Sequence, residues 1–265
     1  MGTLRDFIQY LLRCVLIIMV YTHQLSAQDK KFRNLSDVNE QMGVLIDFNY
    51  SAHYCAGSFS LNYPYAFGLG SRIQLITRSN IMLGISGNYI FNDEVTSDLV
   101  ANLREEEGYI IDRFGELSNV EQGLRGYSLF ATAAYLVPVL KSNKRSGIEC
   151  RLSIGYIRHW ARIEVRGGEI FSLKDDYLKG YDQLHDGIAL QQYVGYRHLD
   201  PNKLINLFAG FEFNQGFTTN RRGYNYQFKQ SDTANKVDLM FGFKIGLTLP
   251  FYIYSALTEK TIKYY

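Results

Sequence analysis

Residues 237–249 read VDLMFGFKIGLTL, and this stretch decides the fold class. All seven odd-numbered positions carry large apolar side chains, whereas Asp238, Lys244 and Thr248 lie on even-numbered positions. Neighbouring side chains of a β-strand point to opposite faces, so a period of two cannot be one face of a helix. The stretch therefore predicts a strand with one apolar face and one polar face.

The same period of two returns in seven more segments of the chain. Most of them match the ~9–11 residues that a tilted membrane strand requires. The composition agrees, because 21 Tyr and 17 Phe against 4 Pro favour strands. Phe130, Leu136 and Gln192 interrupt the alternation. The segments are 43–50, 66–76, 81–92, 126–138, 147–160, 188–198 and 204–214.

The connections between these segments alternate in length without exception. Short connections occur at 77–80, 141–146 and 199–203, and long ones at 51–65, 93–125, 161–187 and 215–236. Outer-membrane barrels combine short periplasmic turns with long outer loops in this way. Residues 43–251 are therefore predicted to form an all-β, eight-stranded antiparallel transmembrane β-barrel. Both termini would be periplasmic, and the four long loops would be extracellular.

The N-terminal segment has the layout of a secretory signal. Two arginines precede the apolar run 14–21, and small residues follow it. That order is typical of a cleaved signal peptide, and eight apolar residues are far short of the ~20 that a spanning helix needs. Residues 1–27 are predicted to be a signal peptide, 28–42 a periplasmic segment and 252–265 a C-terminal tail. The expected location is the outer membrane of a Gram-negative bacterium.

A soluble exported barrel of the lipocalin kind is the alternative, because it would show the same alternation with its apolar face turned inward. The asymmetric loops and the aromatic-rich apolar face favour the membrane. The net charge is close to neutral, with 28 Lys and Arg against 26 Asp and Glu. This excludes the strongly basic face of a dedicated nucleic-acid-binding protein.

The polar face of the predicted strands carries four acids and four bases, which would point into the barrel. They are Asp47, Glu149, Glu212 and Asp238 against Arg72, Arg151, Arg197 and Lys244. An eight-stranded barrel is only wide enough for side chains to fill it, and buried charges persist where they are paired. The balance predicts a salt-bridged plug and no open pore. An ion or proton path is the alternative.

The long loops are strongly charged. Loop 93–125 is acidic, and within it residues 97–108 are predicted to form a short helix that ends at a glycine. Loop 215–236 is basic, and its alternating aromatic residues could extend a hairpin. The acids could pair with the basic loop or hold a cation, but a solvated charged face is the favoured interpretation. No spaced ligand pattern predicts a metal site or a cofactor.

The two cysteines that follow the signal peptide are expected to lie apart. Cys55 falls in the first long loop, and Cys150 follows a turn at the opposite end of the barrel. Because a disulfide needs α-carbons within about 7 Å of each other, no bridge is predicted.

An enzyme of the barrel rim is a further alternative. Its candidate residues are His159, Asp175, Asp176, His185 and Asp186. None belongs to a specific motif, and the chain has no nucleophile elbow, phosphate loop or metal spacing. No catalytic residues are predicted.

The last predicted strand and several scattered stretches resemble a known family. Lys244, Gly246, Leu249 and Phe251 resemble the barrel-assembly signal of last strands. More broadly, the chain resembles an outer-membrane β-barrel family of Bacteroidota. The resemblance implies the barrel fold and an outer-membrane location. It includes an accessory barrel subunit of the barrel-assembly machinery among the expected roles, and it carries over no catalytic residues. The stretches that carry it are 79–91, 102–111, 179–182, 204–213 and 220–222.

The expected function is that of a non-enzymatic interaction subunit, which works through its long loops. A stand-alone adhesin or envelope-stabilising barrel is the alternative. Expected partners are outer-membrane lipid, the barrel-assembly machinery during insertion, and a larger barrel or surface lipoproteins. The residues predicted to contact a partner are Lys179, Gly180, Tyr181, Asp182, Asn220, Arg221 and Arg222.

Overall fold

The computed structural model describes residues 40–140, 143–200 and 205–253. The predicted signal peptide, 1–27, lies outside the described residues. So do most of the predicted periplasmic segment, nearly all of the C-terminal tail, and positions within two of the predicted short turns. No helix within the described ranges is long and apolar enough to cross a membrane.

Eight long strands build the fold, and each contains most or all of one predicted segment. β5 and β6 are the longest, with 24 residues each. The strands are β1 (Gly43–Gly57), β2 (Tyr65–Ile76), β3 (Ile81–Asn92), β5 (Leu117–Leu140), β6 (Asn143–Arg166), β7 (His185–Leu199), β8 (Asn206–Asn220) and β11 (Asn235–Tyr252).

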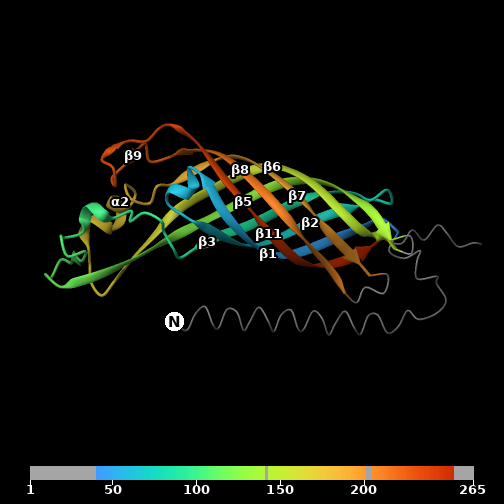
Figure 1. The fold of residues 1–265 in the computed structure, drawn as a ribbon, viewed down its shortest axis with the longest axis horizontal. Helices are drawn as coiled ribbons and strands as arrows, with labels where there is room; N and C mark the ends of the chain where they lie inside the picture. The colour runs from blue at the N-terminus through green and yellow to red at the C-terminus, as the bar shows by residue number, and fades with distance from the viewer. Residues whose placement is uncertain (1–39, 141–142, 201–204, 254–265) are drawn as a thin grey trace, which may run out of the picture.

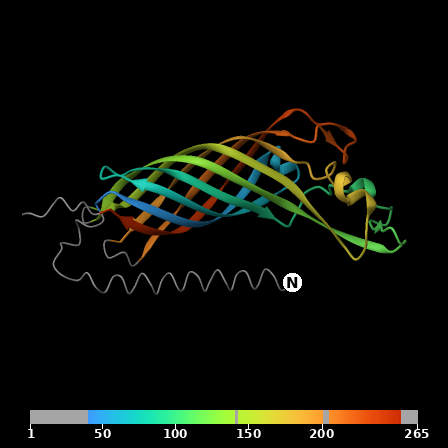
Figure 2. The same cartoon turned by 180° about the vertical axis from the view of Figure 1, so that it is seen from behind.

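The eight strands close into a ring (Figures 1 and 2). Their order is β3-β2-β1-β11-β8-β7-β6-β5, and the pairing of β3 with β5 closes it. Every neighbouring pair is antiparallel, from Gly43–Tyr252 in β1 and β11 to Ile81–Tyr135 in β3 and β5. The predicted eight-stranded antiparallel barrel is confirmed. In a closed ring no strand has an unpaired edge. The backbone N–H and C=O groups of the strands therefore find hydrogen-bond partners without a second sheet.

Short elements decorate one end of the ring, at the left of Figure 1. A two-residue strand, β4 (Ile110–Ile111), pairs with the start of β5, and β9 (Tyr224–Asn225) pairs with β10 (Gln230–Ser231). The short helices are η2 (Phe59–Leu61), η3 (Ala101–Leu103), η4 (Phe171–Leu173) and α2 (Asp175–Leu178). All of them lie in the four long connections, so this end is called the loop end and the other the turn end.

The apolar face of the strands points outward. Along β11, Phe241, Phe243 and Ile245 are 46–50% exposed, while Asp238 and Lys244 are 2–3% exposed. A lipocalin-like barrel requires the opposite arrangement, so the soluble alternative is wrong. Two of the three interruptions of the pattern, Phe130 and Leu136, are buried members of interior clusters. Gln192 faces outward, where Gln215 donates a hydrogen bond to it over 3.4 Å.

Three apolar clusters alternate with polar layers inside the molecule. The turn-end cluster contains Leu45, Ile76, Met82, Ala134, Leu136 and Leu199. The middle cluster contains Cys55, Phe59, Tyr63, Ala66, Ile90, Leu124, Phe130, Ile157, Ala189 and Met240. The loop cluster contains Leu99, Val100, Ile110, Val120, Ala161, Ile163, Ile170, Leu173 and Tyr181.

Several sequence-based boundaries were wrong because the strands continue beyond the predicted segments. β1 runs to Gly57, so Cys55 is a buried strand residue and not part of a loop. Cys150 is exposed, and both thiols are free. The predicted helix over 97–108 is also wrong. Only η3 forms there, because Arg104 adopts an extended backbone and turns its side chain back onto Asp98.

Candidate functional site

A network of buried charges crosses the ring from β1 to β7. The Asp47 carboxylate accepts hydrogen bonds from Arg72 Nε (2.8 Å), Arg197 Nη1 (3.0 Å) and Thr248 Oγ1 (2.6 Å). These groups come from β2, β7 and β11, so they meet only because all of them point inward. Asp47 and Arg197 are 0% exposed.

The other half of this network centres on Glu149 of β6. Its carboxylate accepts hydrogen bonds from Arg151 Nε (2.9 Å) and Arg197 Nε (2.6 Å). The Phe208 ring packs against two of the guanidiniums, with its centroid 4.6 Å from Arg197 Cζ and 5.4 Å from Arg72 Cζ. Two acids and three bases therefore form one paired cluster, and an aromatic ring covers the excess positive charge.

The three remaining predicted interior charges are also buried, but in separate groups. Glu212 pairs with Lys244 and with His53 Nε2 at 3.0 Å. Asp238 accepts hydrogen bonds from His159 Nε2 (3.0 Å) and from Thr218 (2.6 Å). The two histidines, His53 and His159, were not predicted from the sequence as interior partners. The signal was present, because each shares the inward parity of the charged residues on its own strand.

Both ends of the charged layers are covered. The turn-end cluster lies on one side of the Asp47 network, and Arg145 spans that end by donating to the Thr77 and Gln41 carbonyls at 2.8 Å. On the other side, the middle cluster separates the Glu212 group from Asp238. Packed apolar side chains therefore break the polar interior of the ring at two levels, at the turn-end cluster and at the middle cluster.

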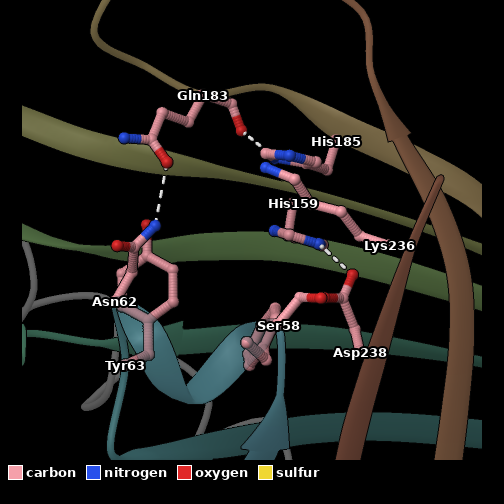
Figure 3. A pocket seen from close by; sticks show the side chains of 9 residues that line it. Ser58, Asn62, Tyr63, His159, Gln183, His185, Lys236 and Asp238 are labelled. Carbon is pink, nitrogen blue, oxygen red and sulfur yellow. Dashed lines mark hydrogen bonds and ion pairs between the residues drawn. The ribbon is translucent and has the colours of Figure 1, made fainter. Parts of the chain in front are cut away.

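A small cavity lies at the loop end, next to His159 and His185 (Figure 3). The two imidazoles stack with centroids 5.3 Å apart and an interplanar angle of 9°. The cavity measures about 20 Å³, which is room for about one water molecule. Lys236 and Asp238 also line it. Asp176 and Asp186, which the rim-enzyme alternative grouped with the histidines, do not line this cavity.

The tautomer of His185 follows from its contacts. The Gln183 carbonyl can only accept, so the short contact with His185 Nδ1 requires that Nδ1 carry the hydrogen. Nε2 of the neutral ring is then a bare acceptor. It is buried without a hydrogen-bond partner among the described groups, and Asp232 Oδ2 is 3.9 Å away. One water molecule could donate one hydrogen bond to His185 Nε2 and another to Asp232 Oδ2. Across the described ranges, no group of three or more metal-ligating side chains is assembled.

The residues predicted to contact a partner lie against one another at the loop end. Arg222 Nε donates to Asp182 Oδ1 over 3.0 Å, and the Arg221 guanidinium pairs with Asp186. The backbone N–H of Arg221 donates to the Leu184 carbonyl over 2.8 Å. These contacts are called the loop clasp, and they join the β6–β7 connection to the β8–β11 connection. Their role toward a partner stays a prediction.

Tyr226 of the β8–β11 connection packs directly over Gly180. Its N–H donates to the Gly180 carbonyl over 3.1 Å, and its ring lies edge-on to Tyr181 at 5.5 Å. A Cβ on Gly180 would sit 2.0 Å from the Tyr226 ring, so only glycine fits there. Asn102 of the β3–β5 connection donates to the Tyr181 hydroxyl over 3.1 Å. Three of the four long connections are therefore held together; Lys179 remains exposed.

The acidic and basic loops meet, but no ion pair joins them in the described part of the chain. Gln227 donates instead to the Asp98 carbonyl over 3.1 Å. Burial raises the pKa of Asp98, but hydrogen bonds from Arg104 and Gln122 outweigh it and hold the pKa below its usual value. Whether the acidic loop binds a cation stays a prediction.

The residues of the predicted assembly signal lie on β11 with both parities. Lys244 and Gly246 point inward, whereas Leu249 and Phe251 point outward. A Cβ on Gly246 would sit 2.4 Å from the Phe208 ring. This glycine therefore makes room for the ring that covers the Asp47 network. Its role in assembly stays a prediction.

Comparison with known proteins gives fold-level similarities only. No protein-family model and no curated protein matches the sequence. Among solved structures, the attachment invasion locus protein Ail of Yersinia pestis, crystallised with the heparin analogue sucrose octasulfate, is 8% identical; the alignment covers 79% of this chain and 99% of that chain, with a TM-score of 0.37. Neisserial surface protein A is 15% identical, over 78% and 96% of the two chains, with a TM-score of 0.37.

The N-terminal β-barrel domain of Pseudomonas aeruginosa OprF is 12% identical, over 78% of this chain and 97% of that chain, with a TM-score of 0.36. At these values, the barrel assignment rests on the strand pairing of the chain itself.

Proposed function

We propose that this chain is an integral outer-membrane barrel without an open pore, and that it acts as a non-enzymatic interaction subunit through its loop end. The observation that carries the proposal is the inverted distribution of polarity. Large apolar side chains cover the outside of all eight strands, while ionised side chains are buried inside. Soluble monomers rarely expose continuous apolar patches larger than a few hundred Å², so the solvent that fits this exterior is lipid.

The polarity reverses where the strands leave the ring, which supports a membrane boundary. On β6, the outward residues Leu152 and Ile154 are 66% and 59% exposed. Closer to the loop end the outward residues are charged, as at Arg162, and the inward ones are apolar, as at Ala161 and Ile163. A strand that passes from lipid into water must exchange its apolar face in this way. The long connections lie at the loop end and the short turns at the turn end. We therefore propose that the loop end faces outside the cell and the turn end faces the periplasm.

A closed interior supports the absence of a pore. Paired charges fill the middle of the ring, and packed apolar clusters lie on either side of them. Purified protein in planar bilayers is therefore expected to give no stable single-channel conductance. Stable, reproducible channels would overturn this part of the proposal.

The loop end supports a binding role more than a catalytic one. The cavity beside the two stacked histidines has room for a single water molecule and none for a substrate. By contrast, three long connections are fixed to one another by the loop clasp, by Tyr226 and by Asn102. A surface that is ordered before binding loses less entropy when a partner docks.

Two experiments test the proposal. First, the full-length chain should partition with outer membranes and migrate differently on gels before and after heating, as a folded barrel does. N-terminal sequencing tests whether residues 1–27 are removed as a signal peptide, so that the mature chain begins with the predicted segment 28–42. Second, tagged protein from mildly solubilised membranes should co-purify, after crosslinking, with a larger barrel or a surface lipoprotein in constant ratio. A lone crosslinked monomer would favour the stand-alone adhesin or envelope-stabilising alternative.

A further inference from the structure

The β5–β6 hairpin extends past the ring. The pairing of β3 with β5 stops at Asn92–Leu124, and that of β6 with β7 stops at His159–His185. Beyond these points, residues 119–123 of β5 pair with residues 162–166 of β6, and residues 117–118 of β5 pair with β4. At ~3.3 Å per residue, these seven positions carry the hairpin roughly 20 Å further along the strands. Figure 2 shows this extension protruding beside α2.

One face of the extension is used internally, and the other is not. Val120 and Ile163 are buried in the loop cluster. At the far end of this extension, Ile111 of β4 (49% exposed) pairs with Leu117 of β5 (65%), and Phe114 (74%) lies in the β4–β5 turn between them. Tyr109 is 53% exposed. These four residues are called the tip patch.

Lipid does not explain the tip patch. Ion pairs on the outward face separate it from the apolar exterior of the ring. Arg125 and Arg162 both bind the Asp93 carboxylate, at 2.6 Å and 3.2 Å, and Arg166 binds Glu121 at 2.8 Å closer to the tip. Several rows of charge thus lie between the lipid-facing band and Phe114, which places the patch in water. Aromatic and branched residues exposed in water beyond a charged band are typical of a protein interface.

The charges around the tip patch identify the kind of partner. Glu105, Glu106, Glu107 and Glu116 are exposed and make no ion pair with any other described residue. Arg113 in the β4–β5 turn pairs with Glu169 at 3.6 Å, and Arg104, which precedes the three glutamates, pairs with Asp98. The rim of the patch is therefore strongly negative, and an acidic partner would be repelled.

We infer that the tip patch docks a protein partner that presents apolar side chains flanked by lysine or arginine. Phe114 is its central anchor, because it is the most exposed aromatic residue of the patch and large rings dominate interface energies. The glutamates of residues 105–107 contribute to the rate and selectivity of association. This inference rests on the proposed function only for the statement that the hairpin projects from the membrane.

The test uses the full chain in cells, with p-benzoylphenylalanine incorporated at Phe114 as a photoreactive probe. Leu61, which is 70% exposed on a different connection, is the matched control position. We expect Phe114 to capture one polypeptide, crosslinked through a peptide rich in lysine and arginine, and Leu61 not to capture it. The combined change Glu105→Gln, Glu106→Gln and Glu107→Gln is expected to reduce the product about tenfold.

Four results would overturn the inference. They are no product from Phe114, a product that lacks basic residues, equal capture from Leu61, and a yield that the glutamine changes do not alter. Heat-dependent migration of the same strains tests the barrel independently. An inserted barrel without capture overturns the docking inference alone. A chain recovered outside the membrane overturns the proposed function, while charge-dependent capture at Phe114 would still support the docking surface.

Discussion

Asp47 and Arg197 form a two-point ion pair inside the ring, with Arg197 Nη1 3.0 Å from Asp47 Oδ1 and Nη2 2.9 Å from Oδ2. They lie on β1 and β7, which are separated in the ring by β11 and β8. The pair is therefore a bridge across the interior and not a contact between neighbouring strands. It fixes the two arcs of the barrel against each other, and it leaves no space between them for an open channel.

Asp47→Asn is expected to destabilise the folded barrel by about 3–5 kcal/mol, because Arg72 and Arg197 would keep their charges while losing their shared carboxylate. Urea unfolding in lipid vesicles, followed through the single tryptophan, measures the change. Lys144→Gln is the control, since it breaks an exposed pair with Glu40 at the turn end and should cost less than about 1 kcal/mol. An equally small effect of Asp47→Asn would show that water reaches the site.

The direction of the strand faces gives a second prediction. Ile245→Arg would put a guanidinium on the outer surface of β11, at a position that is 50% exposed. In lipid this should cost roughly 2–4 kcal/mol if the position lies near the midplane. Phe114→Arg, at a more exposed position of the tip patch, should change stability by less than about 0.5 kcal/mol. Equal effects at both positions in the vesicle unfolding assay would contradict a lipid-facing β11.

The sequence predicted the strands well, because the alternation depends only on which face of each strand is apolar. In every strand of the ring, that apolar face points outward to lipid. It did not predict which charges would meet, since partners such as Asp47 and Arg197 depend on the stagger between strands. The start of β5 was missed for a physical reason. Around Val120 and Leu124 the apolar side chains switch to the inward face, so the two halves of the strand carry opposite patterns.

Gly180→Ala is expected to loosen the loop end without unfolding the barrel. The added methyl group would collide with the Tyr226 ring, so the contact between two long connections cannot form as it does now. Limited trypsin digestion should then cut faster at Arg221 and Arg222, while heat-dependent migration stays unchanged. Lys179→Ala is the neighbouring control; it removes one trypsin site but should leave cleavage at Arg221 and Arg222 as in the natural chain. Unchanged cleavage in Gly180→Ala would mean that Tyr226 can move aside at little cost.

The β8–β11 connection should open in acid before the barrel does. Burial raises the pKa of Asp232, but hydrogen bonds from Asn220 and Lys236 outweigh it, so the pKa in the folded chain is below its usual value, and Asp98 behaves in the same way. A carboxyl whose pKa falls on folding stabilises the fold above its unfolded pKa, near 3.9. That stabilisation is lost as the pH falls through the lower, folded pKa.

Pepsin digestion of the membrane-inserted chain from pH 5 to pH 2 should therefore show the β8–β11 connection becoming accessible below about pH 4, while the strands of the ring stay protected. Asp232→Asn removes one of the titrating groups, so it should shift the onset of cleavage and flatten its dependence on pH. Glu107→Gln, which changes an exposed acid without an ion pair, is the control. Cleavage that begins at the same pH in Asp232→Asn would show that another group controls the opening.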